Sequence, residues 1–571
     1  MKKLILNISQ QTKKLETLIN EKPCLVQTKQ GFSVSYKNKL LYSKYNPISP
    51  IEKSIENLSI PEGTLVLAFS PVLGYGLDLL LSKIQKSSFL FLIENDFSLF
   101  EFSFNCPESK IKNLDLNQSN ICYKNLQTQN DIYKIFNDKK FLDKLKTCKR
   151  VIKINLSAIC TEQENFYQET YNLFSNYIAQ FWKNQITLVK LGKLFSKNIF
   201  LNLPQIANSK KIVLNSIDKP ILVFGAGTSL DKTIKEFNKN KITINDFFII
   251  CVDSALKPLL EYKIIPDIVV AVESQLANEK AFIGTKNIPY LLISDLTSRP
   301  NINNYHNKNI SFIFTEYCNA NFLETIKDLS LHIENFNPLG SVGLYAIELA
   351  IKLRKESYPI FFTGLDFVYT TDATHCKNAP ASFTKLINSN RTNSLIKVDS
   401  SFKFGVNTFN IENKKIISDK PLQNYAIQFV ENFYQTENLY NISDISIFNF
   451  VDNNKKINQL DVNEFIELTK NFTSKEKNEI KFVEKIPDDT KDKIKNYISN
   501  EIFELEEIKN FLTNGNIQIE SLLDKINKHD YLFIHFPDGY KNATEDISFL
   551  KRVRNEIDFF LKILNRSYKL F

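Results

Sequence analysis

The sequence predicts a multi-domain α/β protein whose central part is a Rossmann-like parallel sheet with helices on both faces. The chain has 571 residues, which is more than one hydrophobic core usually organises. Between residues 210 and 455, short buried apolar runs alternate with helical patterns, as they do in parallel sheets. Several of these runs end in glycine-bearing turns that lead into a helix, and such turns expose a helix N-terminus to anions.

The composition indicates a globular protein in a reducing compartment. Hydrophobic residues make up 43% of the chain and charged residues 24%, which argues against global disorder. The net charge of +9 is spread over the chain without a basic cluster interleaved with aromatic residues, so nucleic-acid binding is not expected. The eight cysteines form no CxxC pair and are expected to be free thiols.

Residues 1–14 lack the sustained apolar region of a signal peptide. No apolar run approaches the ~20 residues that a membrane-spanning helix needs. We therefore expect a cytoplasmic protein without a membrane span.

Residues 1–160 are expected to form a smaller domain that is β-rich at first and then Rossmann-like. The stretch "CLVQTKQGFSVSYKNKLLYS" alternates apolar and polar residues and predicts a hairpin or meander. "GTLVLAFSPVLGYGLDLLLSKI" followed by "SSFLFLIEND" predicts a strand, a helix and a second strand. Glu94 and Asp96 end that second strand, where an acid can hold a ribose. Because the preceding turn is irregular, a purely structural domain is the alternative.

Two helical segments flank the central domain. Residues 161–209 carry apolar residues at helical spacing and are expected to be a helical connector that ends near Pro204. Residues 456–571 are expected to be a C-terminal helical domain with two apolar stripes. Core packing explains such stripes most simply, and a partner surface is the alternative.

The first candidate site segment is "ILVFGAGTSLDKTIKEF", residues 221–237, which predicts a strand, a turn and a helix. Gly225 and Gly227 permit a tight turn, and Thr228 and Ser229 offer hydroxyl and N–H groups at the helix start. A phosphate fits such a turn. Taken alone the pattern is weak, because glycine turns after strands are common.

The second segment contains two buried strands that each end in an acid, Asp253 and Glu273. The carboxyl ends of parallel strands line the ligand crevice of open α/β sheets. These acids, with Ser254, Ser274 and Gln275, are candidates for binding ribose, base or substrate hydroxyls. The alternative is that they cap the helices that follow.

The third and fourth segments add a second helix start and a polar loop. Gly340, Ser341 and Gly343 precede a long helix and form a second candidate anion site, or a mobile loop. The strand at 360–363 leads to Gly364, Asp366 and Tyr369, and then to a loop with Asp372, Thr374 and His375. His375 is a candidate general acid or base, or a solvated loop histidine. Cys376 is adjacent in sequence, so a Cys/His nucleophile pair is disfavoured, and no metal-binding spacing is found.

These segments resemble a known family. "GAGTSLDK", "VDSALKPLL", "PDIVVAVES", "GSVGLYAIELA" and "FTGLDFVYT" with "THCKNAP" look like the central domain of the Maf (motility-associated factor) flagellin glycosyltransferases. That domain is shared with archaeal 6-hydroxymethylpterin pyrophosphokinases and is similar to bacterial sialyltransferases that use CMP-sialic acid. The resemblance covers residues 210–450 and extends loosely to "GTLVLAFSPVLGYG" and "NIFLNLPQI". Thr228 departs from the family, which often has proline there.

The resemblance implies transfer of a nonulosonic acid, such as pseudaminic or legionaminic acid, from a CMP donor to Ser or Thr hydroxyls of flagellin in the cytoplasm. It implies a role in assembly of the bacterial flagellum and in motility. The donor phosphate would lie against Gly225, Gly227, Thr228 and Ser229, and Gly340, Ser341, Gly343 and Tyr369 would face the leaving group. His375 would be the base, with Asp366 as its alternative or orienting partner, and Asp253 and Glu273 would hold the donor.

No cofactor is expected, and no metal, because the leaving group is a monophosphate and the central domain has no DxD motif. Two alternatives stay open. One is an ATP-dependent pterin pyrophosphokinase, against which the long flanking segments argue. The other is a non-enzymatic flagellar chaperone or scaffold that keeps the fold.

Overall fold

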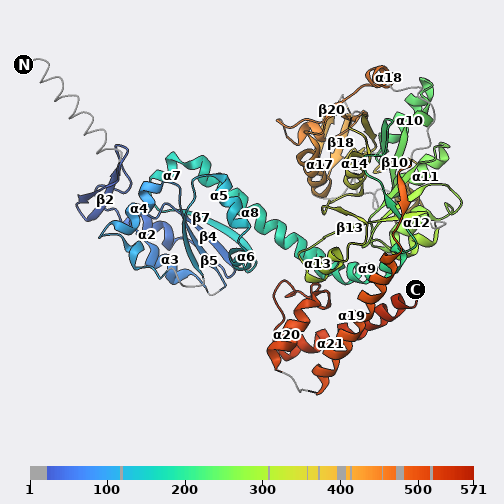
Figure 1. The fold of residues 1–571 in the computed structure, drawn as a ribbon. Helices are drawn as coiled ribbons and strands as arrows, with labels where there is room; N and C mark the ends of the chain where they lie inside the picture. Colours follow the sequence, from blue (N-terminus) through green and yellow to red (C-terminus); the bar gives the residue numbers. More distant parts are fainter. Residues whose placement is uncertain are drawn as a thin grey trace, which may run out of the picture. The chain divides into compact units, whose positions relative to one another are not determined.

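The computed structural model describes residues 22–571, except 86, 116–119, 306–308, 357, 371–372, 395–406, 412–413, 453, 471–480 and 515–517. The stretch 1–14, from which no signal peptide is expected, lies outside the described residues, as does Asp372. The chain forms two compact units, residues 1–187 and 188–571 (Figure 1). No helix in the described part of the chain is long and apolar enough to span a membrane. All eight cysteines are described, and all are free thiols.

The first unit contains an antiparallel meander and a parallel sheet, in the places where the sequence predicts them. The meander is formed by β1 (Cys24–Thr28), β2 (Gly31–Tyr36) and β3 (Lys39–Leu40). The parallel sheet has the order β6-β5-β4-β7, with β4 (Thr64–Phe69), β5 (Phe89–Glu94), β6 (Ile121–Asn125) and β7 (Arg150–Asn155). The helices are α2 (Ser49–Glu56), α3 (Leu77–Lys83), α4 (Phe97–Asn105), α5 (Gln129–Phe136), α6 (Lys139–Leu145), α7 (Ile159–Glu162) and α8 (Glu164–Thr187).

The two acids at the end of β5 form hydrogen bonds and an ion pair within this unit. Glu94 is buried, and its carboxylate accepts hydrogen bonds from the Ser70 hydroxyl at 2.7 Å and from the Asp96 N–H at 3.1 Å. Asp96 caps α4 and accepts from the Tyr36 hydroxyl and the Lys37 ammonium, at 2.8 and 2.9 Å. Since both carboxylates are engaged by the unit's own groups, the structure favours the structural alternative for them.

The second unit is built on a sheet of eleven described strands in the order β20-β19-β15-β9-β10-β11-β12-β13-β8-β21, with β14 paired to β13. All neighbours are parallel except β21 and β8. The strands are β8 (Lys210–Ile212), β9 (Ile221–Phe224), β10 (Phe248–Val252), β11 (Ile268–Ala271), β12 (Leu291–Asp295), β13 (Ile310–Thr315), β14 (Glu334–Phe336), β15 (Ile360–Thr363), β19 (Leu439–Asn441), β20 (Asn458–Gln459) and β21 (Val483–Lys485).

Helices pack on this sheet, so the predicted α/β class with a parallel-rich central sheet is confirmed. They include α10 (Leu230–Lys239), α11 (Asp253–Glu261), α12 (Glu279–Phe282), α13 (Asn321–Asp328), α14 (Val342–Leu353), α17 (Lys420–Phe433) and α18 (Val462–Lys470). Helix α15 (Pro380–Asn388) contacts α11 and buries none of its residues. Helix α14 packs across β9, β10 and β11. A small antiparallel sheet of β16 (Tyr369–Thr370), β17 (Asn407–Ile411) and β18 (Lys414–Ser418) follows β15.

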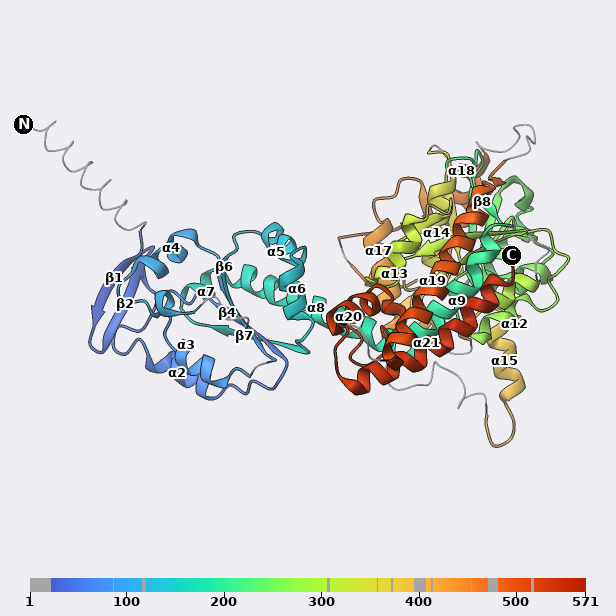
Figure 2. The same ribbon diagram turned by 60° about the horizontal axis from the view of Figure 1, so that its bottom comes forward.

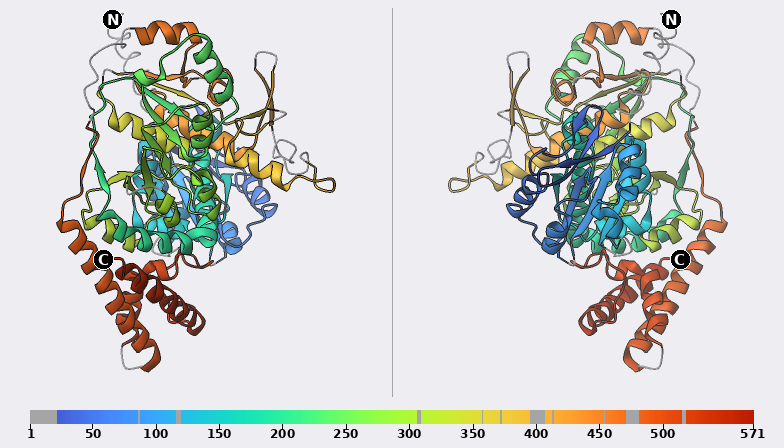
Figure 3. Two further views of the ribbon diagram at one scale, coloured as in Figure 1. Left: turned by 90° about the vertical axis from the view of Figure 1, so that its right-hand side faces the viewer. Right: turned by 90° about the vertical axis from the view of Figure 1, so that its left-hand side faces the viewer.

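Two long helices and a shorter one complete the second unit at one end (Figure 3). They are α19 (Asp489–Asn514), α20 (Ile519–Lys528) and α21 (Ile547–Tyr568). Helix α9 (Lys193–Ile206) lies beside α19 and α21 (Figure 2), so the helical segment expected at 161–209 spans the boundary between the units. The apolar stripes of α19 and α21 are buried in the core that also contains the large sheet, which favours core packing over a partner surface for them.

Candidate active site at the switch point of the large sheet

The chain reverses its direction across the large sheet between β9 and β15. From β9 the strands proceed through β10 to β13 on one side, whereas β15, β19 and β20 lie on the other. Ligands of open α/β sheets bind at the carboxyl ends of the strands at such a switch point. Here the turns that follow β9 and β15 meet: the Gly225 N–H donates to Thr363 O at 2.8 Å, and the Gly227 N–H donates to Gly364 O at 2.7 Å.

The glycines of these turns allow the two backbones to approach each other. A Cβ atom on Gly225 would lie 2.2 Å from the carbonyl oxygen of Gly364, and one on Gly227 would lie 2.4 Å from Asp366 Oδ2. Gly364 has a φ of +73°, a conformation that favours glycine. Turn-to-turn packing therefore accounts for Gly225 and Gly227, for which the sequence predicts the close approach of a phosphate.

The start of α10 already holds an anion that belongs to the chain. Asp366 Oδ2 accepts from the Ser229 N–H at 2.9 Å, and Asp366 Oδ1 accepts from the Ser229 hydroxyl at 2.5 Å. The Thr228 hydroxyl is buried and forms no hydrogen bond within the described residues. Asp366 is only 1% exposed, and this burial raises its pKa to about 6. The donors of Ser229 that the sequence assigned to a phosphate are thus engaged by Asp366.

A cavity of about 220 Å³ opens at the switch point and brings together part of the predicted set. The predicted residues that line it are Gly227, Ser254, Ser341, Gly343, Asp366, Tyr369 and His375. The predicted residues that do not line it are Gly225, Thr228, Ser229, Asp253, Glu273, Ser274, Gln275 and Gly340. Leu422 and Tyr425 of α17 also line the cavity, and no motif in the sequence pointed to them.

The start of α14 faces this cavity. Ser341 caps the helix by accepting a hydrogen bond from the Gly343 N–H at 3.3 Å, and Ser341, Val342 and Gly343 all line the cavity. A helix start carries partial positive charge and N–H groups, which favour a bound anion. The Gly340 N–H, in contrast, donates to Gln428 Oε1 at 2.9 Å. The sequence predicts an anion site at the starts of two helices, α10 and α14. The start of α14 borders the cavity, and no side-chain carboxylate of the described residues binds to it.

His375 lies on the wall of the cavity. Its loop is held in place at the residue that follows it, Cys376. His375 Nδ1 lies 3.1 Å from Thr374 Oγ1, and the Lys385 ammonium also bonds to that hydroxyl. The Cys376 N–H donates to Ala226 O at 3.0 Å, which ties the loop to the turn after β9. Burial raises the pKa of the Cys376 thiol, so this sulfur stays protonated and is a poor nucleophile at neutral pH.

The acids that follow β10 and β11 form local backbone contacts. Asp253 Oδ1 accepts from the Ser254 N–H at 2.6 Å, and burial, reinforced by the charge of Glu273, raises the pKa of Asp253 to about 7. Glu273 Oε1 accepts from the Gln275 N–H at 3.0 Å. Glu273 thus holds the turn after β11, whereas the residue at the cap of the next short helix is Gln275, whose side chain forms no capping bond. In the described part of the chain no three His, Cys, Asp or Glu side chains gather as they do at a metal site.

Comparisons with known proteins agree with this architecture. A family model described as 6-hydroxymethylpterin diphosphokinase MptE-like matches residues 197–372, which contain β9 to β15. An uncharacterized protein of Treponema pallidum (strain Nichols) is 32% identical over 562 residues, which cover 95% of each chain. The solved structure of a MAf glycosyltransferase from Magnetospirillum magneticum AMB-1 covers 96% of this chain and 92% of its own, with a TM-score of 0.53 and 12% identity.

An MptE-like domain therefore lies at residues 197–372 of this chain, and the chain shares its fold with the Magnetospirillum MAf glycosyltransferase. The chain belongs to one family with the Treponema protein, because the two align along nearly their whole lengths. The resemblance seen in the sequence is thereby confirmed, and the likeness to the Magnetospirillum protein extends the shared fold to both units.

Proposed function

We propose that this protein is an O-glycosyltransferase that moves a nonulosonic sugar of the pseudaminic or legionaminic type from a CMP donor to Ser or Thr of flagellin. The observation that carries the proposal is the cavity at the switch point, where the start of α14 and His375 line one space. The shared fold with a MAf glycosyltransferase supports it. The reaction would take place in the cytoplasm and serve flagellar assembly and motility.

The start of α14 would stabilise the leaving group. A nonulosonic acid leaves CMP through a transition state in which negative charge grows on the phosphate. N–H groups and hydroxyls aimed at that charge lower the barrier, because they need no rearrangement when the charge develops. Ser341, Gly343 and the hydroxyl of Tyr369 are the candidates, since all three residues line the cavity.

His375 would accept the proton of the acceptor hydroxyl. A hydroxyl is a weak nucleophile, and a positioned base typically contributes about 10²–10⁴-fold to the rate. Asp366 is less suited to this task, since both of its carboxylate oxygens accept hydrogen bonds from Ser229. We assign Asp366 the task of joining the turns after β9 and β15, and we expect the transfer to need no metal ion.

The direct test is transfer itself. Purified protein is incubated with flagellin and the CMP derivative of pseudaminic or legionaminic acid, with and without EDTA. The mass of intact flagellin is then measured by mass spectrometry. The proposal predicts one or more added sugar masses in both conditions and their loss with His375→Ala. An unchanged flagellin mass with both donors, under conditions in which the protein is folded, would contradict the proposal.

The name of the matched family model favours a second candidate, an ATP-dependent 6-hydroxymethylpterin diphosphokinase. Incubation with the pterin, ATP and magnesium distinguishes it, because only a kinase of this kind forms the pterin diphosphate and AMP. A scaffold without activity is the third reading. It would be supported if the double variant His375→Ala, Asp253→Ala glycosylated flagellin in cells as well as the wild type does.

A further inference from the structure

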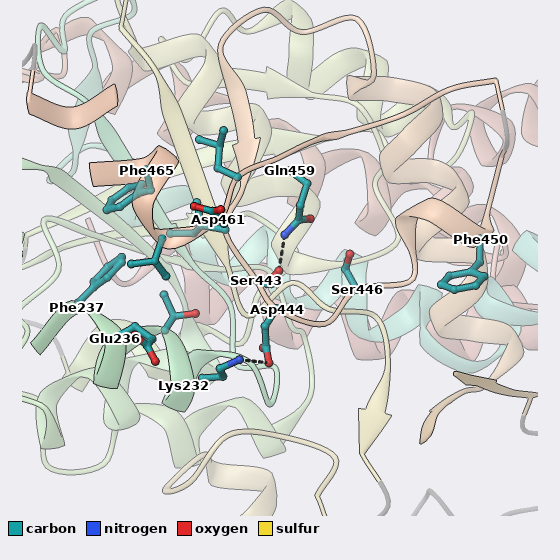
Figure 4. Close-up of a pocket in the computed structure, with 14 residues that line it drawn as sticks. Lys232, Glu236, Phe237, Ser443, Asp444, Ser446, Phe450, Gln459, Asp461 and Phe465 are labelled. Carbon is teal, nitrogen blue, oxygen red and sulfur yellow. Dashed lines mark hydrogen bonds and ion pairs between the residues drawn. The ribbon is translucent and has the colours of Figure 1, made fainter. Parts of the chain in front are cut away.

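A second and larger cavity lies in the same unit, at the β19–β20 edge of the sheet (Figure 4). It encloses about 600 Å³, a volume within the usual range of small-molecule sites. Helix α10, the loop after β19, strand β20 and helix α18 form its walls. It shares no lining residue with the cavity at the switch point, so it is a separate space.

One wall of this cavity is apolar. Phe237 and Phe465 lie on the same side in Figure 4, with ring centroids 5.2 Å apart and planes only 10° from parallel. Both side chains belong to the buried core, and Leu460 and Val462 continue the wall. Such a wall favours a ligand with an apolar body, because the ligand's own apolar surface leaves water when it binds.

Most of the polar groups in the cavity are engaged with each other. Lys232 Nζ and Asp444 Oδ2 form an ion pair at 2.9 Å, and Gln459 Nε2 donates to Ser443 O at 2.5 Å (Figure 4). Asp461 caps the start of α18 by accepting from the N–H groups of residues 463 and 464. These contacts fix the rim of the cavity.

Glu236 is the exception in this cavity. Its carboxylate forms no hydrogen bond or ion pair with any described residue, although the side chain is only partly exposed. The lining contains three carboxylates, those of Glu236, Asp444 and Asp461, and one ammonium. A phosphate or a sugar carboxylate is disfavoured by this surplus of negative charge, so the cavity does not suit a CMP-linked acidic sugar.

We propose that this second cavity binds an organic cation, an amine or guanidinium carried on an apolar stem, with the cation at Glu236 and the stem against Phe237 and Phe465. A cation can form an ion pair with the Glu236 carboxylate, and the faces of aromatic rings also attract cations. The cation is either a free amine or the Lys or Arg side chain of a bound protein. The site goes beyond the proposed transfer reaction, because it needs neither donor nor acceptor hydroxyl.

Calorimetric titration of the full chain with matched probes tests this site. N-acetyl-arginine amide carries the guanidinium, and N-acetyl-citrulline amide has nearly the same shape without the charge. Butylguanidine represents a free small cation of the same charge without peptide groups. The proposal predicts that the arginine probe binds, that the citrulline probe binds more weakly by up to about fivefold, and that Glu236→Gln removes this preference, as expected for one partly exposed ion pair.

Glu261→Gln is the matched control, since Glu261 is exposed on α11 and lines neither cavity. It should leave the preference for arginine unchanged. Leu460→Trp, which narrows the cavity, should weaken all probes. Stronger binding of butylguanidine than of the arginine probe would indicate a free small cation, and the reverse would indicate a protein side chain. Equal binding of the arginine and citrulline probes, or an unchanged preference in Glu236→Gln, would overturn the proposal, and neither result bears on the transfer reaction.

Discussion

The variant Asp366→Asn tests, through the pH dependence of its stability, whether this buried carboxyl joins the turns after β9 and β15 as the structure shows. Burial raises the pKa of this carboxyl from 3.8 to about 6. The folded state therefore holds a proton at pH values where the unfolded chain has released it, so the wild type loses stability as the pH rises from about 4 to about 6. With about 1.36 kcal/mol for each pKa unit, a shift of about two units corresponds to about 3 kcal/mol.

Asparagine cannot ionise, yet its side chain can still accept one hydrogen bond from Ser229. The free energy of unfolding of Asp366→Asn minus that of the wild type should therefore rise by about 2 kcal/mol between pH 4 and pH 7, because part of the full change has already taken place at pH 4. Other groups titrate in both proteins and largely cancel in the difference.

The readout must report on the second unit. Trp182, the single tryptophan, lies on α8 in the first unit, so its fluorescence follows the wrong part of the chain. Pulsed hydrogen exchange of peptides from Leu230–Lys239 along a urea series follows α10 itself. A difference that stays constant with pH, or that falls as the pH rises, would refute the reasoning about Asp366.

The remaining predictions concern the turns, the cap and the base. Gly225→Ala should destabilise the protein by about 3 kcal/mol, since its Cβ would lie 2.2 Å from a backbone oxygen. Gly284→Ala should cost only about 1 kcal/mol, because it has a φ of +87° but nothing within 4 Å; similar melting temperatures for the two variants would count against the packing argument. Ser341→Ala should lower stability by about 1 kcal/mol and weaken CMP binding, whereas unaltered CMP affinity would remove the α14 start from the site. His375→Ala should slow transfer by about 10²–10⁴-fold with an unchanged melting temperature, and full activity would exclude it as the base.

The sequence predicts the strands and turns of the central sheet well, because buried parallel strands have a strong local pattern. "ILVF", "FIICV" and "IFFT" are β9, β10 and β15. Polar residues that follow such strands are necessarily brought to one edge of the sheet. The grouping of Ser254, Ser341, Tyr369 and His375 around one cavity follows from that rule.

The sequence does not show which residue each polar group or turn contacts in the folded chain. Gly225 and Gly227 fit a phosphate turn and a turn-to-turn contact equally well, and the choice depends on Gly364, more than 130 residues away. The same holds for Ser229, whose partner Asp366 lies in the turn after β15. Tyr425 and the cavity beside Glu236 depend on helices whose local sequence shows only ordinary amphipathic patterns.

The measurement that tests the central claim most directly is calorimetric binding of CMP to the full chain, with and without EDTA, in the wild type and in Ser254→Phe. Ser254 lines the cavity at the switch point, so a phenylalanine there fills space that the nucleotide needs. The account predicts CMP binding that survives EDTA and is lost in the variant. Binding of ATP with magnesium but not of CMP, or CMP binding that Ser254→Phe leaves intact, would contradict a cytidylate donor in this cavity.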